Sequence, residues 1–284
     1  DYYIITFCYF PLPILFFLNS LFWVMLCKIC ENKTEYFAEA KILFKYDIKY
    51  YKCSNCGFIQ TEEPYWLDEA YSEAINYSDI GLLKRNSDLV PPTSNIISMF
   101  FNDGKYIDYG AGYGVFVRMM RDNGYDFYWQ DKYCENLYAK DFIFDEATKY
   151  KLLTAYEVFE HLDEPLEEVN KMFQHSENIL FSTYLVPKNN PMPHEWWYYT
   201  TDHGQHISLY SRKSLEILAK KYNKYFYTNG KNIHLISEKK ISGGFFKALT
   251  YPIIANYFPL ISRKKSLLDS DYQRVLENLK ARGA

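Results

Sequence analysis

The chain has 284 residues, 48% of them hydrophobic, which is enough for one large domain or for a catalytic domain with an appendage. Its formal net charge of -3 gives no general attraction to a phosphate backbone, so we expect no nucleic-acid partner.

The first stretch, residues 2–26, carries no charged residue and at about 1.5 Å per residue is long enough to cross a bilayer. Two prolines, Pro11 and Pro13, interrupt it, and it runs directly into Cys27. We therefore expect that native translation begins at Met25 and that the preceding residues are upstream reading frame, in a cytoplasmic protein. The alternative is a membrane anchor, and only then do we expect a membrane as partner.

Two cysteine pairs follow, Cys27-x2-Cys30 and Cys53-x2-Cys56. Each pair presents two thiolates to one tetrahedral centre, so together they predict a closed four-sulfur zinc site in a small ribbon spanning residues 27–60, with a β-hairpin between the pairs. Two disulfides or unrelated thiols are the alternatives. A closed site offers no open coordination position, so we expect structural zinc there.

Residues 61–103 are predicted to be a helical connector. Apolar residues recur at helical spacing from Leu67 to Ile75, and a second helix is expected from Thr93 to Phe101, after two prolines. Aromatic residues such as Tyr71 are candidates to close over a ligand.

A glycine-rich turn organises the next segment. The apolar run Tyr106–Tyr109 predicts a strand that carries Asp108, and an apolar helical pattern begins at Val115. Three glycines alternate between them: Gly110, Gly112 and Gly114. Glycine lets a ligand approach the backbone closely, and the helix start offers unpaired N–H groups. The spacing D-x-G-x-G-x-G differs from the nicotinamide fingerprint, which disfavours a nicotinamide oxidoreductase.

Acidic residues follow two further predicted strands. Asp131 comes directly after the strand Asp126–Gln130, where a carboxylate can accept both ribose hydroxyls of a nucleoside. The strand Lys151–Tyr156 leads into EVFEHLDEP, in which we expect Asp163 to cap the next helix.

These motifs resemble those of a known enzyme family. The glycine turn is similar to the first motif of class I S-adenosylmethionine-dependent methyltransferases, and LLTAYEVFEHLDEP resembles the segment of the methyltransferase group whose fourth strand ends in E-V-x-E-H, with Glu157, Glu160 and His161 matching. The resemblance implies S-adenosylmethionine as cofactor. It implies the cofactor-binding residues Asp108, Gly110, Gly112, Gly114, Asp131 and Glu157. We interpret His161 as a structural histidine.

The remaining elements complete the expected fold. A strand over Asn178–Leu185, a helix capped by Ser211 and a hairpin around the turn Asn229-Gly230 predict the α/β, seven-stranded Rossmann-like methyltransferase sheet with a C-terminal antiparallel hairpin, over residues 104–240. Residues 241–284 form a helical tail, expected to pack on the catalytic domain or on a second subunit. The sequence indicates no oligomeric state.

A short segment bears on the substrate. DHGQHISLYSRKSL resembles the E-H-x-x-Y-[FY]-S segment of zinc-containing sugar C-methyltransferases, but Gln205 stands where that family has Glu. This leaves His206 as the expected catalytic proton acceptor. The resemblance implies a sugar or sugar nucleotide as methyl acceptor.

We therefore predict a methyltransferase acting on a small molecule. The alternative is a zinc-ribbon binding or scaffold protein with a degenerate methyltransferase domain, which would not bind the cofactor.

Overall fold

The structure, a computed structural model, describes residues 25–72, 77–257 and 264–283. Residues 1–24, and with them nearly all of the possible membrane anchor, lie outside the described residues, whereas Met25, the predicted start, is described. Within the described ranges, none of the helices has the length and apolar character needed to cross a bilayer.

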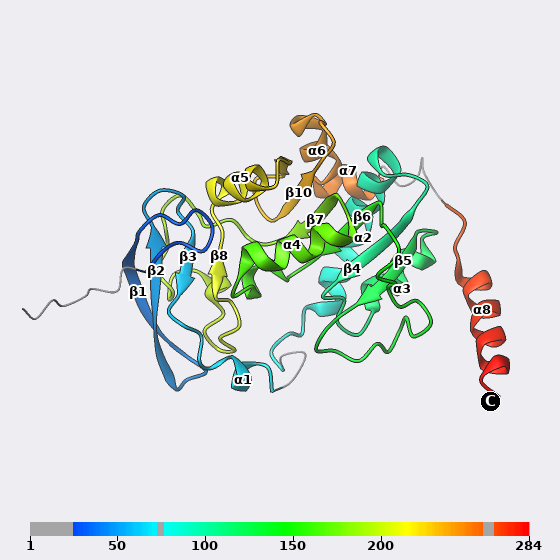
Figure 1. Ribbon diagram of the computed structural model, residues 1–284, viewed down its shortest axis with the longest axis horizontal. Coiled ribbons are helices and arrows are strands. Elements are labelled where there is room, and N and C mark those ends of the chain that lie inside the picture. The colour runs from blue at the N-terminus through cyan, green and yellow to red at the C-terminus, as the bar shows by residue number, and fades with distance from the viewer. Residues whose placement is uncertain (1–24, 73–76, 258–263, 284) are drawn as a thin grey trace, which may run out of the picture.

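A four-stranded antiparallel sheet occupies one end of the molecule (Figure 1). Its strands are β1 (Thr34–Ile42), β2 (Tyr46–Cys53), β3 (Ile59–Thr61) and β8 (Ser208–Leu209), in the order β1-β2-β3-β8. The hairpin expected between the cysteine pairs is β1–β2. The last strand, β8, comes from the second half of the chain and pairs with β3, so this sheet is not built from residues 27–60 alone.

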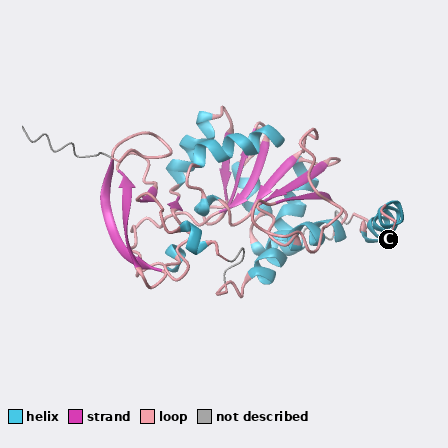
Figure 2. Cartoon of the chain, turned by 60° about the horizontal axis from the view of Figure 1, so that its bottom comes forward, coloured by secondary structure: helices cyan, strands magenta, loops and turns pink. Residues whose placement is uncertain are grey.

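A six-stranded sheet forms the centre of the molecule (Figure 2). Its strands are β4 (Lys105–Tyr109), β5 (Asp126–Gln130), β6 (Leu152–Ala155), β7 (Asn178–Ser182), β9 (Tyr225–Thr228) and β10 (Ile233–Ser237). The order is β5-β4-β6-β7-β10-β9, with β10 antiparallel to both of its neighbours and the other pairs parallel. This mixed sheet is the expected α/β methyltransferase-like architecture with its terminal hairpin.

The expected seventh strand is the main difference. Beside β5, the described chain makes one isolated parallel bridge, between Trp129 and Ile143. Turns on both sides end the pairing: the Phe142 N–H donates to Ala139 O at 2.9 Å, and the Asp145 carboxylate accepts a backbone N–H two residues further on. The sheet therefore has six strands, because this edge segment closes onto itself.

Helices cover both faces of the central sheet. They are α2 (Leu82–Phe100), α3 (Val115–Asp122), α4 (Pro165–His175) and α5 (Arg212–Lys221). Helix α1 (Leu67–Ala70) packs instead against the small sheet, as does the 3-10 turn η2 (Trp197–Tyr199). A second 3-10 turn, η1 (Phe159–His161), precedes α4. Helices α2 and α3 pack in one apolar cluster, and α4 and α5 pack in another. Adjacent strand residues alternate between the clusters, as Leu152 and Leu153 do, because side chains of a strand point to opposite faces.

Helix α2 begins earlier than the prolines predict. The sequence indicates a start at Thr93, but Pro91 and Pro92 lie inside the helix. The carbonyl groups that lose their N–H partners there belong to Ser87 and Asp88, which are exposed to water. Solvent can satisfy these carbonyls, so the helix continues through the prolines.

The two predicted helix caps have different outcomes. Ser211 caps α5, and its hydroxyl accepts the Ser214 N–H at 3.0 Å. Asp163 does not cap α4, because its carboxylate is paired with the Lys28 ammonium group next to the first cysteine. Helix α4 instead begins with Pro165, which has no N–H to satisfy.

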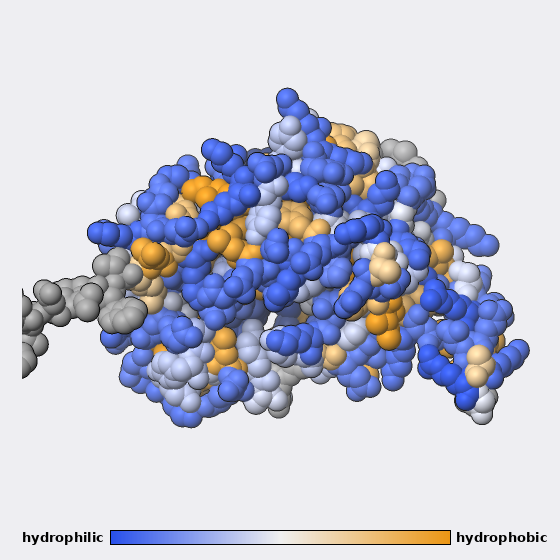
Figure 3. All heavy atoms as spheres, viewed as in Figure 1, coloured by the Kyte–Doolittle hydropathy of each residue, from blue (hydrophilic) through white to orange (hydrophobic). Residues whose placement is uncertain are grey.

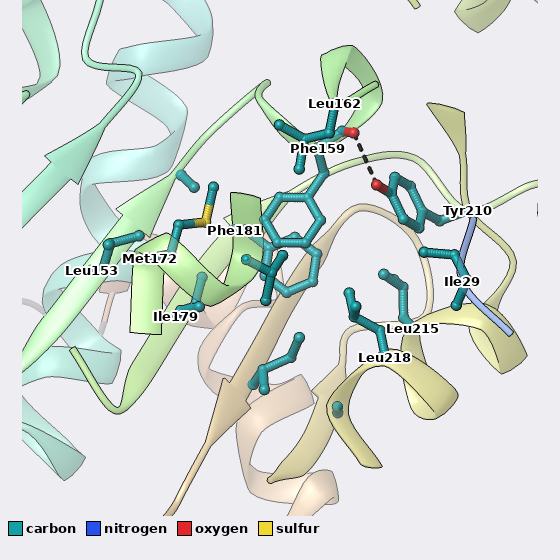
Figure 4. Close-up of a cluster of buried hydrophobic side chains, with 14 of the residues drawn as sticks. Ile29, Leu153, Phe159, Leu162, Met172, Ile179, Phe181, Tyr210, Leu215 and Leu218 are labelled. Atoms are coloured by element: carbon teal, nitrogen blue, oxygen red, sulfur yellow. Dashed lines mark hydrogen bonds between the residues drawn. The ribbon is translucent and has the colours of Figure 1, made fainter. Parts of the chain in front are cut away.

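One apolar cluster joins the two sheets (Figure 4). The rings of Phe159 and Phe181 stack with centroids 3.8 Å apart, and the Tyr210 hydroxyl donates to Phe159 O at 3.1 Å. Ile29 and Phe58, from the cysteine-rich segment, belong to the same cluster. The small sheet is thus packed onto the central one through a shared core.

The tail contains α6 (Gly243–Leu249), α7 (Pro252–Tyr257) and α8 (Leu268–Ala281). Helix α8 lies at the end of the molecule opposite the small sheet and is anchored at its start, where Asp271 pairs with Arg121 at 2.7 Å (Figure 1). On the face drawn in Figure 3, hydrophilic residues predominate and hydrophobic ones are visible as separate patches.

Candidate functional site

A cavity of about 1200 Å³ opens beyond the carboxyl ends of β4, β5 and β6. The chain turns to opposite sides of β4 at this point, since β5 lies on one side and β6 on the other. Ligands of open α/β sheets bind at such a switch point. Five segments line the cavity. They are described residues of the connector between Leu67 and Leu89, the glycine turn with the end of β4, residues 130–134, residues between Tyr156 and Lys171, and the loop from Trp197 to His206.

The glycine turn presents open backbone to the cavity. Gly112 has φ of +54°, and a Cβ placed on it would meet no atom within 4 Å. Gly110 has φ of +71°, and its Cβ would lie 2.6 Å from Val158 Cγ2. The first glycine is therefore required by packing, whereas the second leaves space in which a ligand can contact the backbone.

Asp131 holds this turn in place. Its Oδ2 accepts the Gly112 N–H at 2.8 Å, and its Oδ1 accepts the N–H groups of Tyr133 and Cys134 at 2.7 and 2.8 Å. An ionised carboxylate has about four acceptor positions, so at least one remains for a ligand hydroxyl.

Asp108 lies beneath the turn and is buried. Burial raises the pKa of its carboxyl to about 7, although a hydrogen bond from the Thr154 hydroxyl opposes the shift. The group is therefore poised between its neutral and charged forms near neutral pH.

Glu157 has an unusual backbone, with φ of +54° in a residue other than glycine. Such a conformation costs roughly 1–2 kcal/mol and is held by its surroundings. The Ser182 hydroxyl donates to Glu157 Oε1 at 2.6 Å, and Oε2 lies 3.9 Å from Arg85 Nε. Burial raises the pKa of this carboxyl. Glu157 lines the cavity in this conformation.

His206 lies in the opposite wall, next to His161, with the two ring centroids 5.0 Å apart. Its Nδ1 is 2.7 Å from Tyr198 O, and because a carbonyl can only accept, Nδ1 carries the proton and Nε2 is unprotonated. Burial, with His161 and His203 nearby, lowers the pKa of His206 well below its usual value.

The cavity gathers most of the predicted site residues. Those that line it are Asp108, Gly110, Gly112, Asp131, Glu157 and His206. Gly114 does not line it and instead precedes α3 as its N-cap. Gln205 lines the cavity but is held by a hydrogen bond from its Nε2 to Ala70 O at 2.6 Å.

Two polar residues of the cavity lie outside the motifs read from the sequence. Arg85 reaches the cavity from α2, and Tyr133 stacks on Tyr71 with centroids 5.4 Å apart. Neither belongs to a motif. The E-V-x-E-H spacing did carry one further signal, since it places Glu160 directly beside His161.

The four cysteines converge in the small sheet. The Sγ atoms of Cys27 and Cys56 are 3.5 Å apart, those of Cys30 and Cys53 are 3.4 Å apart, and all four lie within 4.8 Å of one another. None of the described cysteines forms a disulfide.

Solved structures with a similar arrangement include several methyltransferases. An S-adenosylmethionine-dependent methyltransferase from Thermotoga maritima, described as a possible histamine N-methyltransferase, is 11% identical with a TM-score of 0.42, covering 57% of this chain and 94% of that chain. The magnesium protoporphyrin IX methyltransferase of Synechocystis PCC 6803 is 10% identical with a TM-score of 0.41, covering 60% and 92%. A comparison with curated proteins found no match.

A family model described as a methyltransferase domain matches residues 82–225, which are 144 of the 284 residues. The matched range contains the glycine turn, Asp131, Glu157 and His206. The chain therefore belongs to this methyltransferase domain family.

Proposed function

We propose that the cavity binds S-adenosylmethionine along the glycine turn and a small-molecule methyl acceptor opposite it. The open space at Gly112 is the observation that carries this proposal. A side chain at this position would extend into the cavity, so glycine leaves that space to a ligand. In this proposal Asp131 accepts a ribose hydroxyl, and Asp108, Gly110 and Glu157 line the cofactor end of the cavity. Gly114 acts indirectly, because it starts α3 directly after the turn. When bound, the cofactor supplies an electrophilic methyl group on a sulfonium.

The size of the cavity supports two ligands. Pockets for a single drug-sized ligand measure about 300–1,000 Å³, and this cavity is larger. Transfer of a methyl group is a displacement that requires the acceptor atom and the methyl carbon to be aligned, which a shared, walled cavity achieves.

The chemical class of the acceptor follows from the wall opposite the turn. Arg85 and the histidines offer charge and hydrogen bonds, as a polar acceptor requires. The sugar or sugar-nucleotide acceptor stays a proposal, carried by the resemblance around His206. In a metal-free site, Nε2 of His206 is the proposed proton acceptor.

A direct experiment tests the acceptor class. Methyl-labelled S-adenosylmethionine is incubated with the purified protein and with either the small-molecule fraction or the macromolecular fraction of a cell extract. We expect label to be transferred in the small-molecule fraction, and His206→Asn to cut turnover by roughly 10²- to 10⁴-fold with cofactor affinity intact. Transfer of label to macromolecules alone would contradict a small-molecule acceptor.

We further propose that the four cysteines hold one structural zinc ion. With Zn–S bonds of about 2.3 Å, tetrahedral sulfurs lie roughly 3.8 Å apart, and the paired sulfurs here lie 3.4 and 3.5 Å apart. Backbone N–H groups also point at the sulfurs, as Ile29 N does toward Cys27 Sγ at 3.4 Å. The residues thus fit the ion, which would stabilise the fold of residues 27–60.

The division of the chain also stays a proposal: a zinc module at 27–60, a helical connector at 61–103, the catalytic domain at 104–240 and a helical tail at 241–284. The connector supports the catalytic domain directly, since Tyr71 and Arg85 both line the cavity.

A further inference from the structure

Glu160 is a buried carboxyl group with an exposed fraction of 0%. The hydroxyl groups of Tyr198 and Thr183 lie near it but are hydrogen-bonded to each other at 3.2 Å. Among the residues that the structure describes, neither carboxylate oxygen accepts a hydrogen bond of good geometry. Leaving a buried polar group unsatisfied costs about 1–3 kcal/mol, and more if it is charged. An unpaired group of this kind points to an occupant outside the protein chain.

Two imidazole rings lie beside this carboxyl group. One nitrogen of His161, one of His206 and a carboxylate oxygen of Glu160 all lie within 4.8 Å of one another. Ligand atoms bound at 2.0–2.2 Å to a single ion lie at most about 4.4 Å apart, so small side-chain rotations bring the three into contact with one ion.

In both rings, Nδ1 is held by a neighbouring oxygen atom, which leaves Nε2 for a metal ion. His206 donates its Nδ1–H to Tyr198 O at 2.7 Å, and His161 Nδ1 lies 3.0 Å from the Tyr71 hydroxyl. A metal-bound histidine usually gives its other N–H to a backbone carbonyl or a similar group, which fixes the ring and leaves the second nitrogen for the ion.

We propose that Glu160, His161 and His206 form a binding site for a divalent first-row metal ion in the wall of the cavity. Two imidazoles and one carboxylate suit zinc, manganese or iron, and three protein ligands leave coordination positions open. Because His161 and His206 line the cavity, the open positions face the space proposed for the methyl acceptor. The site therefore favours an acceptor that offers an oxygen atom to the metal.

The metal site is inferred independently of the proposed function. Only the statement that the metal contacts the methyl acceptor rests on the proposed function. With the ion bound, Nε2 of His206 is a ligand and cannot take a proton, so the metal replaces His206 as the group that activates the acceptor. Metal binding itself is measurable without any acceptor or cofactor, so its failure would leave the assignment of the methyltransferase untouched.

Titration of Mn²⁺ into the full chain tests the site. Manganese prefers nitrogen and oxygen ligands over thiolates, so it leaves a cysteine-bound zinc ion in place. After the open site has been stripped with a chelator, the electron paramagnetic resonance signal of free Mn²⁺ should report one bound ion per chain. Loss of a residue that only hydrogen-bonds to a metal ligand weakens metal binding by roughly 10- to 100-fold. Glu160→Gln and His206→Asn each remove a ligand, so each should weaken Mn²⁺ binding by more than this.

His203→Asn is the matched control, since its ring lies 5.3 Å from that of His206 but outside the three-residue set. It should bind Mn²⁺ like the unmodified chain. Thermal unfolding shows whether each variant is folded. Glu160→Gln should unfold no earlier than the unmodified metal-free chain, because it removes a buried acid. Mn²⁺ should raise the unfolding temperature of the unmodified chain and of His203→Asn, but not that of Glu160→Gln. Absence of bound Mn²⁺ in the unmodified chain, or equal binding by Glu160→Gln, would overturn the proposal.

Discussion

Asp131 Oδ2 accepts a hydrogen bond from the backbone N–H of Gly112 at 2.8 Å, so the residue expected to hold the ribose also holds the glycine turn. The hydrogen bond joins two segments 19 residues apart in one wall of the cavity. Any change at Asp131 therefore acts on the ligand and on the loop together.

Asp131→Ala should weaken S-adenosylmethionine binding by roughly 1.5–3 kcal/mol, or about 10- to 150-fold. The substitution removes a charged acceptor and releases three backbone N–H groups of the loop. Isothermal titration measures the affinity. Asp68→Ala, an exposed carboxylate on another wall of the cavity, is the control and should change the affinity less than about twofold. Equal affinities for both variants would remove Asp131 from the cofactor site.

Cys53→Ser should release the proposed zinc ion, whereas Cys134→Ser, outside the cluster, should retain it. Metal analysis of freshly reduced protein should give one zinc per chain before the change and none after it. Because Cys53 belongs to the apolar cluster that also contains Leu215 of α5, we expect the unfolding temperature of the whole chain to fall. A metal-free unmodified protein would exclude the four-cysteine zinc site.

The local motifs could be predicted because each is contiguous in sequence. The glycine turn, the strand before Asp131 and the cap at Ser211 depend on neighbouring residues, and the structure has all three. The absence of a seventh strand could not be predicted from the sequence. It depends on turns that compete with strand pairing at Trp129.

The proximity of Glu160 to His206 could not be predicted from the sequence for a different reason. Glu160 and His206 are 46 positions apart, and only the path of the chain through β8, where the Ser208 hydroxyl donates to Leu162 O at 2.6 Å, brings them together. Tertiary contacts of this kind leave no periodic signal in the sequence. His161 was interpreted as structural for the same reason.

Asp271→Asn should destabilise the chain by roughly 3 kcal/mol, because it leaves a buried cation with a partial set of partners. Arg121 and Asp271 have side chains only 4% and 5% exposed, and Arg121 keeps Asp126 as its second partner. Urea unfolding measures the change. Asp269→Asn, exposed on the same helix, should stay within about 0.5 kcal/mol of the unmodified chain. If the two variants unfold alike, α8 is not anchored by this pair.

Asp108 should make stability fall as pH rises. Its pKa is about 7 in the folded chain against an ordinary value of 3.8, so the folded state holds a proton that the unfolded state loses between these pH values. Stability from this group is therefore present below about pH 4 and lost as pH rises through about 7. From pH 5 to pH 8 without cofactor, Asp108→Asn should gain roughly 2–3 kcal/mol relative to the unmodified chain.

Urea unfolding at the two pH values checks this prediction. Asp103→Asn serves as control, because the Asp103 side chain is 90% exposed and should show no such change. A stability difference between Asp108→Asn and the unmodified chain that does not change with pH would show that Asp108 does not titrate in this range.

Isothermal titration of S-adenosylmethionine into the unmodified chain, Gly112→Val and Gly230→Val tests the central claim most directly. Both glycines have positive φ and open space at Cβ, but only Gly112 lines the cavity, so the pair separates backbone strain from occupation of the cofactor space. We predict binding of one S-adenosylmethionine per chain, no measurable binding by Gly112→Val and unchanged affinity for Gly230→Val. An unmodified chain that releases no binding heat, or a Gly112→Val variant that binds as tightly, would contradict cofactor binding along the glycine turn.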